Sequence, residues 1–194
     1  MRGRLLLSLL FLTSCVSNPA YPHEWPDFSG DRYEDCPKIS GMYSDEVYEA
    51  LAPYAEDPRH PPHSNLSRGL PLGYMDKTRI LVKPKVKIVQ SPGGELEFSL
   101  LDDETVVIKK TYSKQAGDFY CNGTELKFWS WGGLGTVGLG LGWGETTFRK
   151  AVDGSLVVKS QGRVAGLIFL VFPIVVLNER QWYLYKEARS SLAE

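Results

Sequence analysis

The chain has 194 residues, of which 43% are hydrophobic and 23% are charged, and this composition is typical of a globular domain and excludes wholesale disorder. Its 22 lysines and arginines nearly balance 23 aspartates and glutamates. No basic excess is present to neutralise phosphates, so we expect no nucleic-acid partner. Three cysteines and three histidines, scattered along the chain, are too few for a zinc-finger or iron–sulfur framework.

Residues 1–14 have the layout of a secretory signal peptide. Arg2 and Arg4 precede an apolar run over residues 5–12, which is much shorter than the roughly 20 residues of a membrane-spanning helix. The run ends in Leu12–Cys15, with the sequence LTSC. This tetrapeptide resembles the lipobox of bacterial lipoproteins, in which an aliphatic residue and two small residues precede a cysteine. The alternative is an ordinary cleaved signal with a chance cysteine.

The lipobox resemblance implies that the Cys15 thiol receives a diacylglyceryl group, that cleavage then removes residues 1–14, and that the new amine is often acylated. Two or more acyl chains hold a protein stably on a membrane. Val16 follows the cysteine, in place of the aspartate that retains many lipoproteins in the inner membrane. We therefore expect a lipid-anchored protein of the bacterial cell envelope. The anchor is expected in the outer membrane, with the domain facing the periplasm, so the membrane itself is an expected binding partner.

Residues 15–35 contain three prolines among polar neighbours, which favours an extended, lipidated tether between the anchor and the domain. The segment also carries three aromatic residues, Tyr21, Trp25 and Phe28. Their rings dock either on the domain or in the membrane interface, and the sequence leaves both alternatives open.

The segment 44–72 is expected to be a proline-rich insert of helix and loop. Ser44 is a suitable N-cap, and two acidic residues follow it, where the positive end of a helix dipole favours them. Apolar residues at helical spacing then share one face: Val47, Leu51 and Tyr54. This pattern predicts a short helix over 44–56. The prolines and glycine of 58–71 predict a loop.

Two segments alternate apolar and polar residues with period two, which is typical of half-buried strands. Their apolar positions are all even-numbered: Ile80, Val82, Val86 and Ile88, then Leu96, Phe98 and Leu100. Ser91–Gly94 connects the two segments. Because apolar residues must face one another across a hairpin, the loop must contain an odd number of residues. Three is the simplest choice, with glycine at positive φ.

Six more segments are expected as strands: 104–112, 124–131, 143–151, 155–161, 164–176 and 180–186. Turn-forming pairs separate several of them: Asn122–Gly123, Asp153–Gly154 and Asn178–Glu179. The sequence therefore predicts a mainly β domain over 36–187, with a C-terminal tail over 188–194. Its fold is expected to be an antiparallel meander of about eight strands that forms a small barrel or sandwich, with one short N-terminal helix.

Cys36 and Cys121 remain once Cys15 is lipidated. Exported compartments are oxidising, so an even pair of cysteines there is expected to form a disulfide. This bridge would fasten the N-terminal part of the domain to the strand region. The alternative is two buried free thiols.

Glycines recur through 132–144, and Gly133, Gly135 and Gly138 match the GxGxxG pattern of dinucleotide-binding loops. That pattern needs a helix after it, and alternating glycines make a poor helix, so we expect no nucleotide site. The run fits a strand with one bare face that another backbone can approach closely. Self-association or membrane contact is the functional alternative. The apolar stretch 164–177 fits a strand buried on both faces, or one that contacts lipid.

Other candidate sites have simpler explanations. His60 and His63 flank two prolines without a nearby third ligand, which favours a surface loop over a metal site. The three lysines of 83–87 form a basic stripe that could meet anionic lipid head groups, but Glu95 and Glu97 on the next strand are placed to pair with it. No catalytic triad or zinc-hydrolase motif can be assembled. We therefore expect no enzymatic activity, no metal and no cofactor.

Three stretches resemble elements of uncharacterised proteobacterial lipoproteins: Cys36–Tyr43 (CPKISGMY), Asp153–Val158 (DGSLVV) and Glu179–Tyr183 (ERQWY). This resemblance implies no known activity. Gly41 and Tyr43 are also faintly similar to the G-x-W of the first lipocalin strand. We expect a non-enzymatic envelope lipoprotein that binds a protein partner or a lipid ligand, or has a structural role. The alternative is a lipocalin-like carrier of a small apolar or lipid ligand.

Overall fold

The computed structural model describes residues 18–51, 66–69, 81–133, 138–168 and 172–188. These residues contain twelve strands and one short helix. In chain order the elements are β1 (Arg32–Tyr33), β2 (Cys36–Pro37), β3 (Gly41–Ser44), β4 (Glu49–Leu51), α1 (Leu66–Gly69), β5 (Pro84–Ser91), β6 (Glu95–Asp102), β7 (Thr105–Ser113), β8 (Tyr120–Cys121), β9 (Leu126–Gly133), β10 (Gly138–Lys150), β11 (Leu156–Ile168) and β12 (Phe172–Tyr185). The predicted mainly β class is confirmed.

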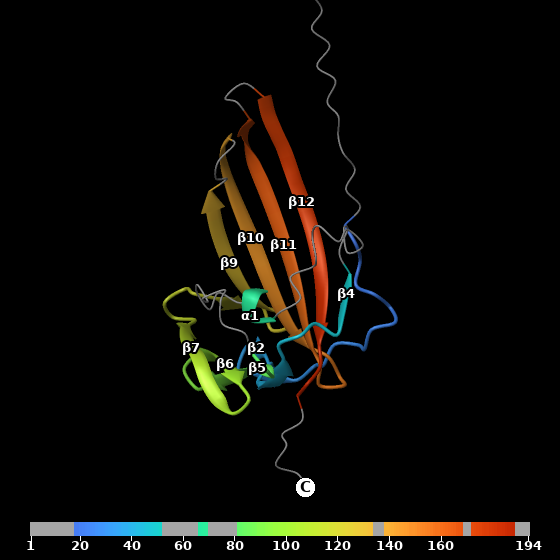
Figure 1. Ribbon diagram of the computed structural model, residues 1–194, viewed down its shortest axis with the longest axis vertical. Helices are drawn as coiled ribbons and strands as arrows, with labels where there is room; N and C mark the ends of the chain where they lie inside the picture. Colours follow the sequence, from blue (N-terminus) through green and yellow to red (C-terminus); the bar gives the residue numbers. More distant parts are fainter. Residues whose placement is uncertain (1–17, 52–65, 70–80, 134–137, 169–171, 189–194) are drawn as a thin grey trace, which may run out of the picture.

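Most of the strands belong to two antiparallel sheets (Figure 1). The larger sheet has the order β4-β12-β11-β10-β9-β8, and the smaller sheet has the order β3-β5-β6-β7. Consecutive strands are neighbours within β5–β7 and within β9–β12, as expected for a meander with short connections. A bridge between Tyr43 and Glu187 joins the two sheets at one edge. The two sheets form a sandwich and not a closed barrel.

Large side chains from both sheets fill the space between them. The ring of Phe98 on β6 lies 5.9 Å from that of Phe128 on β9 and 6.0 Å from that of Phe148 on β10, measured between centroids. Phe98 and Phe148 are fully buried. Tyr43 of β3 and Tyr183 of β12 belong to the same cluster. Burial of this apolar surface, worth roughly 25 cal/mol per Å², holds the two sheets together.

The hairpin between β5 and β6 has the three-residue loop that the sequence predicts. Ser91 pairs with Glu95, so that Ile88 lies opposite Phe98, and both of these apolar side chains are buried. The last two loop residues are Gly93 and Gly94, with φ of 88° and 78°. Glycine is required there because a Cβ atom disfavours positive φ.

Two of the three predicted turns are confirmed. Gly123 and Gly154 adopt positive φ in the connections that precede β9 and β11. The turn predicted at Asn178–Glu179 is wrong, because these residues lie inside β12 and pair with Arg163 and Gly162 of β11. Asparagine favours turns, but the continuous ladder between two long strands outweighs that local preference here.

The strand predicted over 164–176 is also wrong in its bounds. β11 continues through Gly162 to Ile168, and β12 begins at Phe172, so the apolar stretch is divided between two paired strands. The three residues between these strands, 169–171, are all apolar, and Gly166 and Pro173 lie inside the strands, so the sequence gives no signal of a reversal at that point. The prediction that residues 164–177 are buried on both faces concerns side chains that the structure does not describe.

The helix predicted over 44–56 is wrong for the part that the structure describes. β3 ends at Ser44, and the next residues lead into β4, which pairs with β12 at the edge of the larger sheet. The Tyr48 N–H donates a hydrogen bond to the Leu184 carbonyl (2.8 Å). Pairing with the sheet edge satisfies these backbone groups and outweighs the helical pattern of the sequence. Residues 52–56 lie outside the described residues.

The helix that the structure does describe, α1, lies in the predicted loop. Asp45 is buried, and its carboxylate accepts hydrogen bonds from the Ser67 N–H (2.6 Å) and the Ser67 hydroxyl (3.0 Å). The Leu66 N–H donates to the Asp45 carbonyl (2.7 Å). Asp45 therefore satisfies backbone donors at the start of α1, as a capping side chain does, although it is distant in sequence.

The segment before β1 is docked on the larger sheet, on the side opposite the smaller sheet. Trp182 Nε1 donates a hydrogen bond to the Pro19 carbonyl (3.1 Å). The centroid of the Tyr21 ring lies 4.4 Å from that of Phe28, 5.3 Å from that of Trp182 and 5.8 Å from that of Trp25. Of the two alternatives for these aromatic residues, the structure shows the first: their rings dock on the domain. We call residues 18–30 the docked segment.

The docked segment is expected to loosen at alkaline pH. Burial raises the pKa of Tyr21 from 10.0 to about 12, against a smaller opposite effect of Arg149. Because the folded-state pKa lies above the unfolded value, this contribution to stability is complete below pH 10 and is lost as the pH rises toward 12. Urea unfolding should therefore show a steeper alkaline loss of stability in the wild type than in Tyr21→Phe. Equal losses in both proteins would contradict this prediction.

Candidate functional site

The larger sheet has a second face, directed away from the smaller sheet. Side chains alternate along β9, β10 and β11, and even-numbered residues such as Phe128, Phe148 and Val158 enter the core. The odd-numbered residues share the opposite face, which we call the outer face: Lys127, Trp129, Trp143, Glu145, Thr147, Arg149, Lys159 and Gln161. The docked segment covers one part of it, where Arg149 lies 3.4 Å above the centre of the Phe28 ring.

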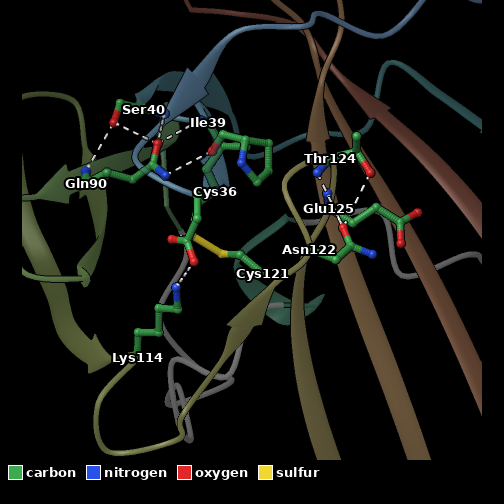
Figure 2. Close-up of a disulfide and its surroundings, with 11 residues drawn as sticks. Cys36, Ile39, Ser40, Gln90, Lys114, Cys121, Asn122, Thr124 and Glu125 are labelled. Carbon is green, nitrogen blue, oxygen red and sulfur yellow. Dashed lines mark hydrogen bonds and ion pairs between the residues drawn. A yellow bond between two sulfur atoms is a disulfide. The ribbon is translucent and has the colours of Figure 1, made fainter.

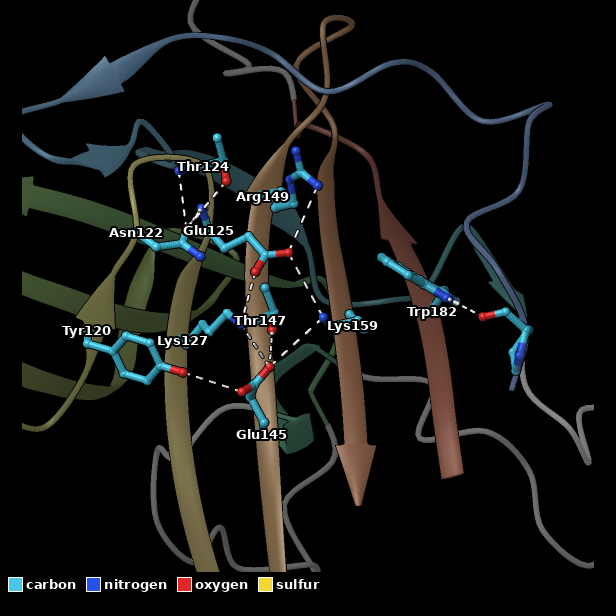
Figure 3. A network of polar contacts seen from close by, with 11 residues as sticks. Tyr120, Asn122, Thr124, Glu125, Lys127, Glu145, Thr147, Arg149, Lys159 and Trp182 are labelled. Atoms are coloured by element: carbon cyan, nitrogen blue, oxygen red, sulfur yellow. Dashed lines mark hydrogen bonds and ion pairs between the residues drawn. The ribbon is translucent and has the colours of Figure 1, made fainter. Parts of the chain in front are cut away.

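Charged side chains on the outer face form one connected network (Figure 3). Lys127 Nζ lies 3.0 Å from Glu125 Oε2 and 3.2 Å from Glu145 Oε1. Lys159 Nζ lies 3.9 Å from a carboxylate oxygen of each glutamate. The Thr147 hydroxyl donates to Glu145 Oε1 (3.1 Å). The register brings these groups together, because Thr147 pairs with Lys127 on one side and Lys159 on the other.

The side chains of Lys127, Lys159, Glu125 and Glu145 are only 15–18% exposed, and this partial burial strengthens their ion pairs. Burial alone would raise the pKa of Glu125, but Lys127, Lys159 and Arg149 together hold it below its ordinary value. Burial would lower the pKa of Lys127, and the carboxylates of Glu125 and Glu145 raise it instead. Glu125 and Lys127 are therefore both charged at neutral pH. Neither exchanges a proton near neutrality, which fits a binding surface better than a catalytic one.

A hollow of about 140 Å³ lies beside the network and is lined by Trp129, Trp143, Glu145 and Gln161. Trp129 is 50% exposed. Its ring is stacked with that of Tyr120 on β8, with centroids 6.2 Å apart and planes inclined by 19°. The Tyr120 hydroxyl lies 3.4 Å from Glu145 Oε2. Aromatic rings therefore border a polar floor, an arrangement that is typical of binding sites.

Cys36 and Cys121 form the predicted disulfide (Figure 2), with Cα atoms 5.1 Å apart. The bridge joins β2 to β8 and so connects the N-terminal part of the domain to the edge of the larger sheet. Next to it, Gln90 Oε1 on β5 accepts hydrogen bonds from the N–H groups of Ile39 (2.7 Å) and Ser40 (3.1 Å). The chain after β2 is thus held against both sheets.

Several predictions for individual residues lie outside the described residues: those for Cys15 and for the pair His60 and His63. The basic stripe of β5 is described, and Glu97 forms its ion pair with Lys109 of β7 (2.7 Å). The prediction that Glu97 pairs with the lysines of β5 is therefore wrong, because its ion-pair partner lies on the other neighbouring strand, β7. The hydrogen bond from Lys109 is the main cause that lowers the pKa of Glu97, and Lys87 contributes least.

The glycine run of β10 lies beside the apolar stretch of β11. Gly138, Gly140 and Gly142 of β10 pair with Ile168, Gly166 and Val164 of β11. The two segments are thus antiparallel neighbours across the connection at Asp153–Gly154. The side-chain contacts of this region lie outside the described ones.

The outer face is not among the sites predicted above, although the sequence contains a signal for it. Charged and aromatic residues alternate with apolar residues at Glu125, Lys127 and Trp129, and Trp143 and Glu145 are likewise spaced two residues apart. Period two alone shows that these residues share a face of one strand. The register between β9 and β10 is needed to show that the two sets lie next to each other.

Searches with the whole chain find no matching family model, curated protein or solved structure. Within the described residues, no group of three or more histidine, cysteine, aspartate or glutamate side chains could hold a metal ion. No helix in the described part of the chain is long and apolar enough to cross a membrane. The geometry of the outer face is therefore the basis for placing a candidate site there.

Proposed function

We propose that this protein is a non-enzymatic lipoprotein of the bacterial cell envelope, anchored through an acylated Cys15 and binding a partner through its outer face. The observation that carries the proposal is the lipobox, Leu12–Cys15, directly after a short apolar run. We place the anchor in the outer membrane, with the domain facing the periplasm, because Val16 follows the cysteine. The disulfide between Cys36 and Cys121 supports an oxidising compartment.

The docked segment limits the distance between the domain and such an anchor. An extended chain covers at most about 3.6 Å per residue, so Asn18 lies within about 11 Å of Cys15. Pro19 and Tyr21 are in turn held against β12 by Trp182. An acylated Cys15 would therefore hold the larger sheet close to the membrane surface, where it meets other envelope components.

A binding surface agrees better with the packing than an internal carrier site does. A carrier of an apolar ligand needs a cavity between the sheets, and the rings of Phe98, Phe128 and Phe148 lie there in mutual contact. The hollow lined by Trp129 and Gln161 lies instead on the outer face, and its lining is partly polar.

Replacing Cys15 with serine is expected to abolish lipidation and with it the lipid anchor. Serine lacks the thiol that receives the lipid, so the variant should remain an uncleaved or soluble precursor. Metabolic labelling with radioactive palmitate, followed by membrane fractionation, measures both effects. Ser17→Ala is the matched control, because it changes a small residue just outside the lipobox and should be labelled like the wild type. Equal labelling of Cys15→Ser and the wild type would refute the proposal.

A further inference from the structure

The hollow on the outer face combines an aromatic platform with hydrogen-bonding groups. Isolated exposed apolar side chains are common and carry no meaning by themselves. Here, however, Trp129 is stacked with Tyr120, and Trp129 and Trp143 both line the same hollow. Tyrosine and tryptophan are enriched in binding surfaces because each supplies a large apolar area together with a polar group. The platform therefore suits a ligand with a flat apolar face.

The floor of the hollow suits a ligand that carries a hydroxyl group. Glu145 Oε1 accepts hydrogen bonds from Thr147 and Lys127, whereas Oε2 has the Tyr120 hydroxyl at the long distance of 3.4 Å. A carboxylate has about four acceptor positions in all, so Oε2 has capacity for a further donor. An acceptor beside aromatic rings matches a ligand in which a hydroxyl group borders an apolar face.

The charges around the hollow argue against a cationic ligand. An aromatic site that binds a quaternary ammonium group uses ring faces and gains from an uncompensated negative charge. The carboxylate of Glu145 is already close to two ammonium groups, Lys127 at 3.2 Å and Lys159 at 3.9 Å. Its field is therefore largely neutralised at the hollow, and a neutral polar ligand is favoured.

We propose that the outer-face hollow binds a pyranose ring of a glycan. The apolar C–H face of the sugar would lie on Trp129, and an equatorial hydroxyl group would donate a hydrogen bond to Glu145 Oε2. A hollow of about 140 Å³ is smaller than a pocket for a drug-sized molecule, which starts at about 300 Å³. The hollow therefore accepts one sugar ring, and the neighbouring sugars of the glycan would lie on the exposed surface of the sheet. This inference deepens the proposed binding role by naming its ligand class.

A fluorescence titration tests the proposal on the lipidated protein in phospholipid nanodiscs, which contain no sugar-based detergent. The probes are cellotetraose and tetra-N-acetylchitotetraose, two oligosaccharides with equatorial substituents, and choline chloride represents the cationic alternative. We expect saturable quenching or a spectral shift with at least one oligosaccharide and none with choline. Trp129→Ala should weaken binding about tenfold or more, equivalent to about 1.4 kcal/mol, and Trp129→Phe should recover most of the affinity because it restores a flat ring.

Tyr48→Ala is the matched control, because it removes a 60% exposed aromatic ring that does not line the hollow. It should bind sugar like the wild type, and all variants should show the thermal melt of the wild type. Three results would overturn the proposal: no saturable response to either oligosaccharide, unchanged affinity in Trp129→Ala, or tighter binding of choline than of sugar. None of these results alters palmitate labelling of Cys15, so the failure of this inference is distinguishable from the failure of the proposed function.

Discussion

Replacing Cys121 with serine is expected to lower the free energy of unfolding by about 4 kcal/mol. The disulfide links residues separated by 85 positions, and the chain-entropy account gives roughly 4–5 kcal/mol for a loop of that length. Cys36 is buried in the core, whereas Cys121 is partly buried on the two-residue strand β8. Serine at position 121 therefore removes the bridge with less disturbance of packing than serine at position 36.

Denaturant unfolding of oxidised wild type and Cys121→Ser, followed by circular dichroism, measures this loss. Reduced wild-type protein is the control, since it lacks the same covalent link while keeping both sulfur atoms. It should lose nearly the same stability as the variant. A variant as stable as the oxidised wild type would show that the bond between Cys36 and Cys121 contributes nothing to the fold.

Truncating Phe148 to alanine is expected to cost about 3–5 kcal/mol of stability. Phe148 is fully buried on β10, and its ring lies 6.0 Å from that of Phe98 and 5.8 Å from that of Phe128. Its cross-strand neighbours Leu126 and Val158 are also buried. Rings from both sheets surround the site, so the void cannot close unless the sheets move. The cavity adds to the lost transfer free energy.

Val152→Ala provides the comparison for Phe148→Ala, because Val152 follows β10 closely but is 66% exposed. It should change the unfolding free energy by less than about 0.5 kcal/mol. Thermal and urea unfolding of the two variants should therefore separate them clearly. Similar, small losses in both would contradict the position of Phe148 at the centre of the sandwich.

The sequence predicts the hairpin of the smaller sheet well, because its register follows from local rules. The apolar positions of β5 and β6 share one parity, and two glycines supply positive φ in the connecting loop. Pairing of Ser91 with Glu95 is the direct consequence. The bond between Cys36 and Cys121 is likewise predictable, because once Cys15 is set aside by its resemblance to a lipobox cysteine, the two other cysteines have one pairing available.

The conformation of 45–51 could not be predicted from local pattern. The buried carboxylate of Asp45 has its partner at Ser67, and Tyr48 has its partner at Leu184. Both contacts depend on tertiary structure. Local helix signals and an available sheet edge compete here, and the edge provides hydrogen bonds that the helix pattern cannot anticipate.

The outer face could not be predicted for a related reason. Lys127 and Trp129 lie on β9, and Glu125 directly precedes it. Glu145 lies on β10 and Lys159 on β11. Only the register of three strands makes them a network. The tryptophans on their own are consistent with a buried sheet, and the structure is needed to show that Trp129 is half exposed.

The most direct test of the lipoprotein proposal is the intact mass of the protein extracted from envelope membranes. The account predicts a chain that begins at Cys15, carries a diacylglyceryl group on its thiol, and is two hydrogens lighter than the reduced form because Cys36 and Cys121 are bonded. Acylation of the new amino group would add one further chain. A mass that includes residues 1–14, or a mature chain that carries no lipid at Cys15, would contradict it.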